Sequence, residues 1–289
     1  MVQFKDFKSL ASAITRVENH LLGSAELLQQ LQPGNMPVIG FTGPPGAGKS
    51  SLINALTDLW LQQGKKLGLL LVDPSSPFNY GALLGDRLRL SAHFLNPNLY
   101  IRSISSRGSL GGLSDSIVEV LEVMRAADFD LILVETVGVG QSEVEIAGLA
   151  DLTVVVLVPE SGDAIQAMKA GVMEIADLFC INKADRELAD QMVHALQNQL
   201  AISHRDTQVM KTIATEGKGV EELAKAIQQQ GAAAKNLEKK SILSARKALQ
   251  LIRQFRTRDI HDQDLIREIQ DLMRSGNFQL FRYIQKYIS

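Results

Sequence analysis

The sequence has one cysteine, Cys180, among 289 residues, and its formal net charge is only −2. A single thiol excludes an internal disulfide and is typical of a reducing cytoplasm. The nearly balanced charge gives no electrostatic reason for binding nucleic acid or an anionic membrane surface. No apolar run approaches the roughly 20 residues that cross a bilayer, and the early charges at Lys5, Asp6 and Lys8 are unlike a secretory signal. We therefore expect a cytoplasmic protein with neither a nucleic-acid nor a membrane partner.

Three regions differ in their apolar patterns. Residues 1–36 predict a helical N-terminal extension, with helix over 1–32 ended by Pro33 and Gly34. Residues 37–231 alternate short apolar runs with amphipathic stretches, which predicts an α/β domain with a mostly parallel, doubly wound sheet. Residues 232–289 lack strand patterns and predict two or three helices, which we interpret as a C-terminal extension and dimerisation arm.

Within the central region, the expected elements follow from these alternating patterns. The expected strands are Val38–Thr42, Leu67–Val72, Leu99–Ile101, Leu131–Val134, Thr153–Val158, Leu178–Ile181 and Val209–Ala214. Helices are expected between them, for example at Ser51–Gln63, Ser114–Ala127 and Arg186–Leu200.

A phosphate-binding loop follows the first expected strand. Its eight residues match the pattern G-x-x-x-x-G-K-[ST] and open a helix, as the P-loop mechanism requires. Backbone N–H groups and the helix N-terminus would cradle phosphate oxygens, Lys49 would reach the β and γ phosphates, and the Ser50 hydroxyl would ligate Mg²⁺. The expected nucleotide-binding residues are Gly43, Pro44, Pro45, Gly46, Ala47, Gly48, Lys49, Ser50 and Ser51.

A second motif, Ile181-Asn-Lys-Ala-Asp185, indicates guanine selectivity. The Asp185 carboxylate would accept hydrogen bonds from N1–H and the N2 amino group of guanine, and adenine lacks both donors. Asn182 would brace the loop, and the stem of Lys183 would lie over the ring. Ala214 or Thr215, at the end of the last expected strand, would offer a backbone N–H to the base. The expected ligands are therefore GTP and GDP with Mg²⁺.

Three acidic residues stand beside strand ends or glycine turns. Glu135 ends the fourth expected strand and would hold Mg²⁺ or its water shell, and Asp73 and Asp86 are further magnesium candidates. Asp73 has an Asx-turn as its alternative role, and Asp86 has a helix cap or a surface charge. Gln141 either orients the attacking water or caps the next helix. We interpret Lys49, Glu135, Asp73 and Gln141 as the catalytic set, and we expect slow hydrolysis without a partner.

Longer strings resemble one family, the methylmalonyl-CoA mutase-associated GTPases of the MeaB/ArgK type. The resemblance rests on 71–78, 81–87, 100–103, 106–112 and 134–143, together with the P-loop and the N-K-A-D motif. It implies a GTP-hydrolysing, metallochaperone-like protein that gates cofactor loading and protection of an adenosylcobalamin-dependent acyl-CoA mutase. It also implies a homodimer. Residues 159–169 are similar to a further family switch, although Ala164 and Ala170 replace an acidic residue and a lysine there.

Other functions remain open on the sequence. A metal-centre insertion GTPase is the first alternative, but such proteins usually carry clustered Cys and His ligands, and here Cys180 lies in an apolar strand while the five histidines are scattered. The second is an ATP-dependent kinase or transport accessory, which the N-K-A-D motif disfavours. A nucleotide-sensing scaffold without turnover is the third.

Overall fold

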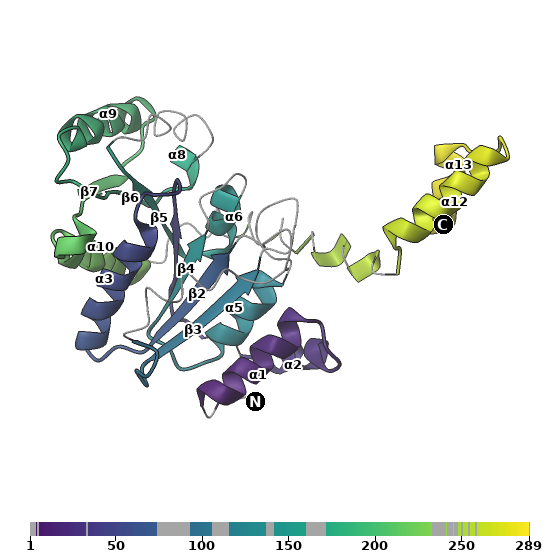
Figure 1. Cartoon of the computed structure of the whole chain (residues 1–289), viewed down its shortest axis with the longest axis horizontal. Coiled ribbons are helices and arrows are strands. Elements are labelled where there is room, and N and C mark those ends of the chain that lie inside the picture. The colour runs from purple at the N-terminus through teal and green to yellow at the C-terminus, as the bar shows by residue number, and fades with distance from the viewer. Residues whose placement is uncertain are drawn as a thin grey trace. The chain divides into compact units, whose positions relative to one another are not determined.

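The computed structural model describes residues 4, 6–32, 34–73, 93–105, 116–136, 142–159, 172–232, 241, 245, 248–249, 251–253, 255–257 and 259–288. The chain forms two compact units, Met1–Asn236 and Leu237–Ser289. Figure 1 shows the sheet and its surrounding helices in the first unit and a helical hairpin in the second.

The first unit is built on a seven-stranded sheet with the order β3-β2-β4-β1-β5-β6-β7. All of its strand pairs are parallel. The predicted fold class, a mostly parallel α/β sheet, is therefore confirmed. The strands are β1 (Val38–Thr42), β2 (Leu67–Asp73), β3 (Leu99–Ser105), β4 (Leu131–Thr136), β5 (Leu152–Leu157), β6 (Leu178–Ile181) and β7 (Gln208–Lys211).

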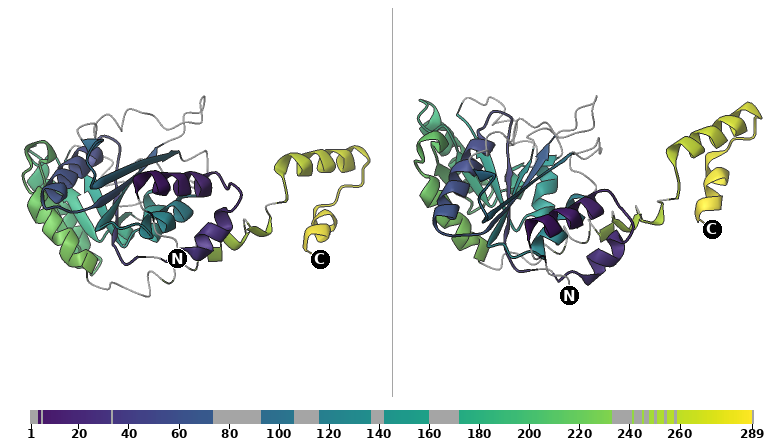
Figure 2. Two further views of the ribbon diagram at one scale, coloured as in Figure 1. Left: turned by 90° about the horizontal axis from the view of Figure 1, so that it is seen from below. Right: turned by 60° about the horizontal axis from the view of Figure 1, so that its bottom comes forward.

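Both faces of the sheet are covered, which explains why its central strands are almost continuously apolar. On one face, alternate residues of the strands pack against α3 (Lys49–Gln62) and α10 (Val220–Ala232). On the other, they pack against α1 (Phe7–Glu18), α5 (Ile117–Arg125) and α6 (Ser142–Leu149). The β5–β6 end of that second face is covered by α8 (Val172–Ile175) and α9 (Ala189–Ile202). Figure 2 shows these layers from two further directions.

The expected single helix over 1–32 is wrong. The structure has two helices, α1 and α2 (Ser24–Gln30), separated at Asn19–Gly23. Gly23 lies in the left-handed region with φ 82° and precedes α2, and His20 has φ 48°. Leu21 and Leu22 are exposed in this break, so the helical spacing of the apolar residues does not continue across it.

The expected strand Val209–Ala214 is also wrong at its end. The strand stops at Lys211, and Ala214 begins a short 3-10 helix, Ala214–Glu216. The chain leaves the sheet here because Ile213 pairs with Lys218 in a tight antiparallel bridge. Gly219 allows this turn: it has φ 73°, and a Cβ there would lie 2.1 Å from the carbonyl oxygen of Lys211.

The N-terminal helix α1 is an integral part of the first unit. Asp6 caps it by accepting a 2.7 Å hydrogen bond from the Ser9 backbone N–H. Phe7 packs against the rings of Tyr100 and Phe129. At the other end, the buried Glu18 carboxylate receives the Arg102 guanidinium from β3. Helix α1 is therefore fastened at both ends to the edge strand of the sheet.

The second unit contains α12 (Asp262–Arg274) and α13 (Leu280–Ile288). Tyr283 donates a 2.8 Å hydrogen bond to Glu268, and the Lys286 ammonium contacts the same carboxylate. The Lys286 Nζ atom also lies 4.4 Å from the ring centre of Tyr283. These contacts join the two helices into a hairpin. Across both units, none of the helices formed by described residues has the length and apolarity needed to span a bilayer.

Candidate functional site

The site lies at the carboxyl ends of the parallel strands, beside β1. Strands β2, β3 and β4 lie on one side of β1 and β5, β6 and β7 on the other, so the strand order reverses at this point. The P-loop follows β1 and leads directly into α3. Gly43 and Gly48 have φ of 138° and 83°, so both adopt backbone that favours glycine. A Cβ at Gly43 would lie 2.0 Å from the Val156 carbonyl oxygen on β5, so the loop passes close to that neighbouring strand.

Lys49 is folded back over this loop. Its ammonium donates hydrogen bonds of 2.7 and 3.1 Å to the carbonyl oxygens of Gly43 and Pro44. The side chain is only 7% exposed. The structure thus holds a buried cation above the strand-to-helix turn. A phosphate seated in that turn would meet this charge together with the positive end of the α3 dipole.

Ser50 and Glu135 meet across the top of the sheet. The Ser50 hydroxyl donates a 2.6 Å hydrogen bond to Glu135 Oε1. Glu135 reaches this position because β4 lies directly beside β1, with Phe41 in register with Glu135. The next residue, Thr136, is buried, and its hydroxyl donates to the Phe41 carbonyl oxygen at 3.3 Å. Two oxygen groups that were predicted to hold magnesium are therefore adjacent.

Asn182 joins the P-loop to the loop after β7. Its Nδ2 donates a 3.0 Å hydrogen bond to the carbonyl oxygen of Ala47. Its Oδ1 accepts from the Ala214 N–H at 3.2 Å and from the Thr212 hydroxyl at 3.1 Å. Lys183 has φ 56°, and its ammonium donates to the Gly46 carbonyl oxygen at 2.8 Å. Two residues of the N-K-A-D motif are thus anchored on the P-loop.

A pocket of about 240 Å³ opens between these loops. Its lining includes residues of the P-loop, the N-K-A-D motif and the segment after β7, which are far apart in the sequence. The lining residues are Gly48, Ser51, Asn182, Lys183, Asp185, Arg186, Ile213, Ala214 and Thr215. Because Asp185 is exposed to this space, its carboxylate is free to meet an incoming base edge.

Three residues of this site had no individual role in the sequence prediction: Arg186, Ile213 and Thr212, although the segment 212–215 was expected to complete the base pocket. Arg186 directly follows the N-K-A-D motif, and Ile213 directly precedes the expected N–H donors. Their position next to predicted site residues in the sequence could have identified both. Thr212 carried no such signal, because its hydroxyl contributes through Asn182 and not through the pocket surface.

Other predicted positions lie beyond the description. Asp86 and Gln141 fall outside the described residues, as does most of the 159–169 segment. Asp73 ends β2, and only its place in the strand is described. In the part of the chain that is described, no three His, Cys, Asp or Glu side chains come together as a metal site. The roles of all the predicted site residues stay predictions.

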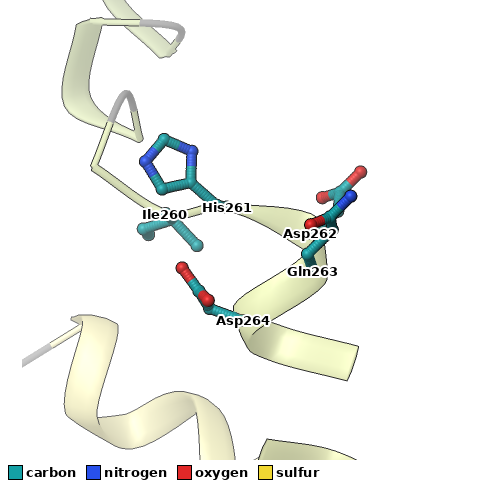
Figure 3. A pocket seen from close by; sticks show the side chains of 5 residues that line it. All are labelled: Ile260, His261, Asp262, Gln263 and Asp264. Atoms are coloured by element: carbon teal, nitrogen blue, oxygen red, sulfur yellow. The ribbon is translucent and has the colours of Figure 1, made fainter. Parts of the chain in front are cut away.

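A larger hollow, of about 580 Å³, lies in the second unit at the start of α12. Five consecutive residues, Ile260 to Asp264, line it, and Asp262 and Gln263 point away from His261 and Asp264 (Figure 3). A single short stretch of chain does not bring polar groups together from several directions. The smaller pocket at the P-loop does so, and we therefore place the functional site there.

Comparison with known proteins identifies related sequences over most of the chain. The family described as methylmalonyl Co-A mutase-associated GTPase MeaB matches residues 10–269. A Pyrococcus horikoshii protein named as a GTPase is 43% identical over 233 residues, 78% of this chain and 74% of that protein. GTPase ArgK of Escherichia coli is 36% identical over 260 residues, 85% of this chain and 76% of its own length. The mitochondrial methylmalonic aciduria type A homolog of Mus musculus is 39% identical, covering 62% of this chain and 47% of that protein.

Solved structures agree with the fold. The LAO/AO transport system kinase superimposes with a TM-score of 0.67 at 25% identity, over 97% of this chain and 91% of its own. HypB from Helicobacter pylori, solved with nickel, gives a TM-score of 0.52 at 15% identity, over 77% of this chain and 94% of its own. At that identity, the likeness to HypB shows a shared fold alone.

Proposed function

The chain belongs to the methylmalonyl-CoA mutase-associated GTPase family, MeaB, and we propose that it couples GTP hydrolysis to cofactor loading and protection of an adenosylcobalamin-dependent acyl-CoA mutase. That it is a guanine-nucleotide hydrolase follows from the family, whose members are named as GTPases. The association with a mutase as the client protein is our proposal, and so is the magnesium site. The observation that carries the proposal is the convergence of the P-loop and the N-K-A-D motif on one pocket.

The P-loop is the proposed triphosphate site. On nucleotide binding, Lys49 would exchange its two carbonyl acceptors for phosphate oxygens, which compensate its charge better. The positive φ angles at Gly43 and Gly48 let the loop turn, so that its backbone N–H groups would face the phosphates. These residues would bind and orient the γ-phosphoryl group, since phosphoryl transfer depends mainly on positioning and charge stabilisation.

The Ser50–Glu135 pair fits a magnesium ion. A hydroxyl and a carboxylate are the hard oxygen ligands that Mg²⁺ prefers, and the 2.6 Å contact shows that both reach the same place. We propose that Ser50 binds the ion and that Glu135 holds it or its water shell, with Asp73 and Asp86 as further candidates. The ion, when bound, neutralises charge that develops on the phosphate oxygens.

The pocket at Asp185 is the proposed guanine site. Asp185 would accept two hydrogen bonds from the base, and the Ala214 or Thr215 N–H would donate one. The stem of Lys183 is already placed by its bond to Gly46, so it would cover one face of the ring. An adenine base would leave the carboxylate unpaired, at a cost of roughly 1–3 kcal/mol for each unmet bond.

Mutase association is tested by co-purification. The full-length chain, loaded with GDP or with a non-hydrolysable GTP analogue, would be mixed with an adenosylcobalamin-dependent acyl-CoA mutase from the same cell. We expect association whose strength depends on the nucleotide, and mutase-stimulated GTP hydrolysis. Absence of both effects with every such mutase, for a chain that binds GTP, would remove the mutase from the proposal and leave the GTPase.

We also propose a homodimer, with 232–289 contributing to it. Light scattering during size-exclusion chromatography would give the mass directly. A monomer at micromolar concentration would contradict this part. As for the alternative of metal-centre insertion, the described residues offer no cluster of three metal-ligating side chains to support it, so we do not adopt it.

A further inference from the structure

Three polar side chains are buried beneath the proposed guanine site. Cys180 is 0% exposed, Thr212 is 1% exposed and Asn182 is 2% exposed. Cys180 lies on β6, Asn182 follows that strand, and Thr212 follows β7, its parallel neighbour. Polar groups buried this completely cost free energy unless each is hydrogen-bonded. The way they are bonded is therefore informative.

The direction of each hydrogen bond is fixed from the Asn182 end. The Ala214 N–H can only donate and the Ala47 carbonyl can only accept, so Asn182 must present its oxygen to the first and its amino group to the second. The Thr212 hydroxyl also approaches the Asn182 oxygen, at 3.1 Å, and must donate to it. The only hydroxyl proton of Thr212 is thereby committed.

Cys180 must then be the donor to Thr212. Its Sγ lies 3.1 Å from the Thr212 hydroxyl oxygen, which has no second proton to give. Burial raises the pKa of the Cys180 thiol to about 12, outweighing the opposite effect of its bond to Thr212, so the thiol keeps its proton at neutral pH. The hydrogen bonds are thus all donated in one direction: Cys180 donates to Thr212, Thr212 to Asn182, and Asn182 to the Ala47 carbonyl oxygen.

Thr212 also holds the backbone of the base motif. Its carbonyl oxygen accepts a 3.0 Å hydrogen bond from the Ala184 N–H, one residue before Asp185. Its own N–H donates to the Ile181 carbonyl oxygen at 2.9 Å. One residue therefore fixes both the rotamer of Asn182, through its hydroxyl, and the path of the loop that carries Asp185, through its backbone.

We infer that Thr212 and Cys180 are positioning residues for the guanine nucleotide, acting through Asn182. The relay sets the distance between the P-loop at Ala47 and the base-contacting segment at Ala214, because the Asn182 side chain bridges the two. The space is tight: a Cβ at Gly48 would lie 2.4 Å from Asn182 Nδ2. This inference rests on the proposed function, since it concerns the same nucleotide pocket.

The test compares Thr212→Val, which removes the hydroxyl at nearly constant volume, with Thr212→Ser, which keeps it. Isothermal calorimetry would give the GDP and GTP affinities of the full chain. We expect Thr212→Val to bind both nucleotides about tenfold more weakly and Thr212→Ser to stay within about twofold of the wild type, with the loss in Thr212→Val larger in affinity than in kcat at saturating GTP. Thr153→Val is the matched control, because Thr153 is another buried threonine at the amino end of β5.

The S–H stretching band gives a readout that does not depend on activity. Cys180 is the only cysteine, so the band has a single source. A thiol that donates to oxygen absorbs at lower frequency than a free thiol. We expect the band to rise in frequency in Thr212→Val and to return in Thr212→Ser, while Thr153→Val leaves it in place.

The outcomes separate the inference from the proposed function. Wild-type protein that binds neither GDP nor GTP would overturn the proposed function, and this inference with it. Normal wild-type binding with equal affinity in Thr212→Val, or equal weakness in the Val and Ser variants, would overturn the inference alone. An S–H band that does not respond to Thr212→Val would remove Cys180 from the relay. If Thr212→Val does not fold, Cys180→Ala replaces it, with an expected loss of about threefold in affinity and wild-type affinity as the contradicting result.

Discussion

Ser50, at the start of α3, donates a 2.6 Å hydrogen bond to Glu135 on β4, although 85 residues separate them. The contact depends on the sheet order, which places β4 next to β1. Both groups were expected to serve the same magnesium ion, and the fold places them in contact with each other. Substitution of either residue therefore tests whether the pair binds magnesium.

Glu135→Gln should weaken the response to magnesium. The amide keeps the shape of the side chain but loses the negative charge that would hold the ion or its water, so we expect half-maximal GTP hydrolysis to require about tenfold more Mg²⁺. The measurement is the hydrolysis rate against Mg²⁺ concentration. Glu26→Gln, an exposed change on α2, is the control. An unchanged magnesium requirement would remove Glu135 from the metal site.

Lys49→Ala should nearly abolish turnover. It removes a cation that is buried at the P-loop, so charge on the β and γ phosphates goes uncompensated, and we expect kcat to fall by at least about 100-fold. Single-turnover hydrolysis of GTP measures the effect. Lys66→Ala is the matched control, because Lys66 forms an ion pair with Asp128 and precedes β2 at the amino ends of the strands, away from the P-loop. Retained turnover in Lys49→Ala would refute the P-loop assignment.

The fold was largely predictable because its signals are local. Apolar runs such as Leu67–Val72 and Leu131–Val134 are recognisable as buried parallel strands, and each appears in the structure with its end shifted by no more than a few residues. The P-loop and the N-K-A-D motif carry their own geometry in their residue types. The pocket they share follows from the rule that parallel strands end at one edge.

What the sequence could not give were features set by tertiary contacts. The break between α1 and α2 depends on left-handed backbone at His20 and Gly23. The end of β7 depends on a bridge between Ile213 and Lys218. Thr212 was not singled out because its role comes from a side chain 30 residues away. None of these leaves a periodic pattern.

Asp185→Asn should change which base is bound. The amide can donate to the xanthine oxygen where the carboxylate repels it, and it can no longer accept both guanine donors, so we expect GTP affinity to fall about 10- to 100-fold while XTP affinity rises. The ratio of the two affinities, from competition binding, is the measurement. Asp190→Asn, an exposed change nearby on α9, should leave the ratio unaltered. The same ratio in Asp185→Asn would contradict the assignment of the base pocket.

The α12–α13 hairpin should lose stability at low pH through Glu268. A hydrogen bond from Lys286, and to a smaller extent one from Tyr283, holds the pKa of Glu268 below its ordinary value. A lowered folded pKa means that the stabilisation is fully present above the unfolded pKa of about 4.3 and is lost as the pH falls through the lower folded value. The bond to Glu268 raises the pKa of Lys286, so its contribution is present below about pH 10.4 and is lost only as the pH rises through that higher value.

Glu268→Gln tests this hairpin prediction. We expect faster amide exchange in residues 262–288 of the variant than of the wild type at pH 7, and equal exchange once the pH lies well below the folded pKa. Comparing the two proteins at one pH cancels the intrinsic pH dependence of exchange. Asp271→Asn is the control, because Asp271 forms an ion pair with Arg274 of its own helix, at 3.5 Å. A difference of the same size at both pH values would contradict the prediction.

The contact between Glu18 and Arg102 should matter for the stability of the first unit mainly because removing one partner leaves the other charge buried and uncompensated. The side chains of Glu18 and Arg102 are 10% and 21% exposed, and the Arg102 guanidinium also donates to Thr15 at 3.3 Å. Among the described residues, the buried Arg102 Nε has no hydrogen-bond acceptor. Removing the carboxylate in Glu18→Met therefore leaves a largely buried charge, and we expect the free energy of unfolding to fall by about 3 kcal/mol. Replacing both residues, in Glu18→Met with Arg102→Met, removes the charge as well as its partner and should restore stability to within about 1 kcal/mol of the wild type. Urea denaturation, followed by fluorescence of the single tryptophan, Trp60, gives all three values. A double variant as unstable as Glu18→Met would mean that α1 is held to β3 by the ion pair itself and not by the apolar packing of Phe7 against Tyr100 and Phe129.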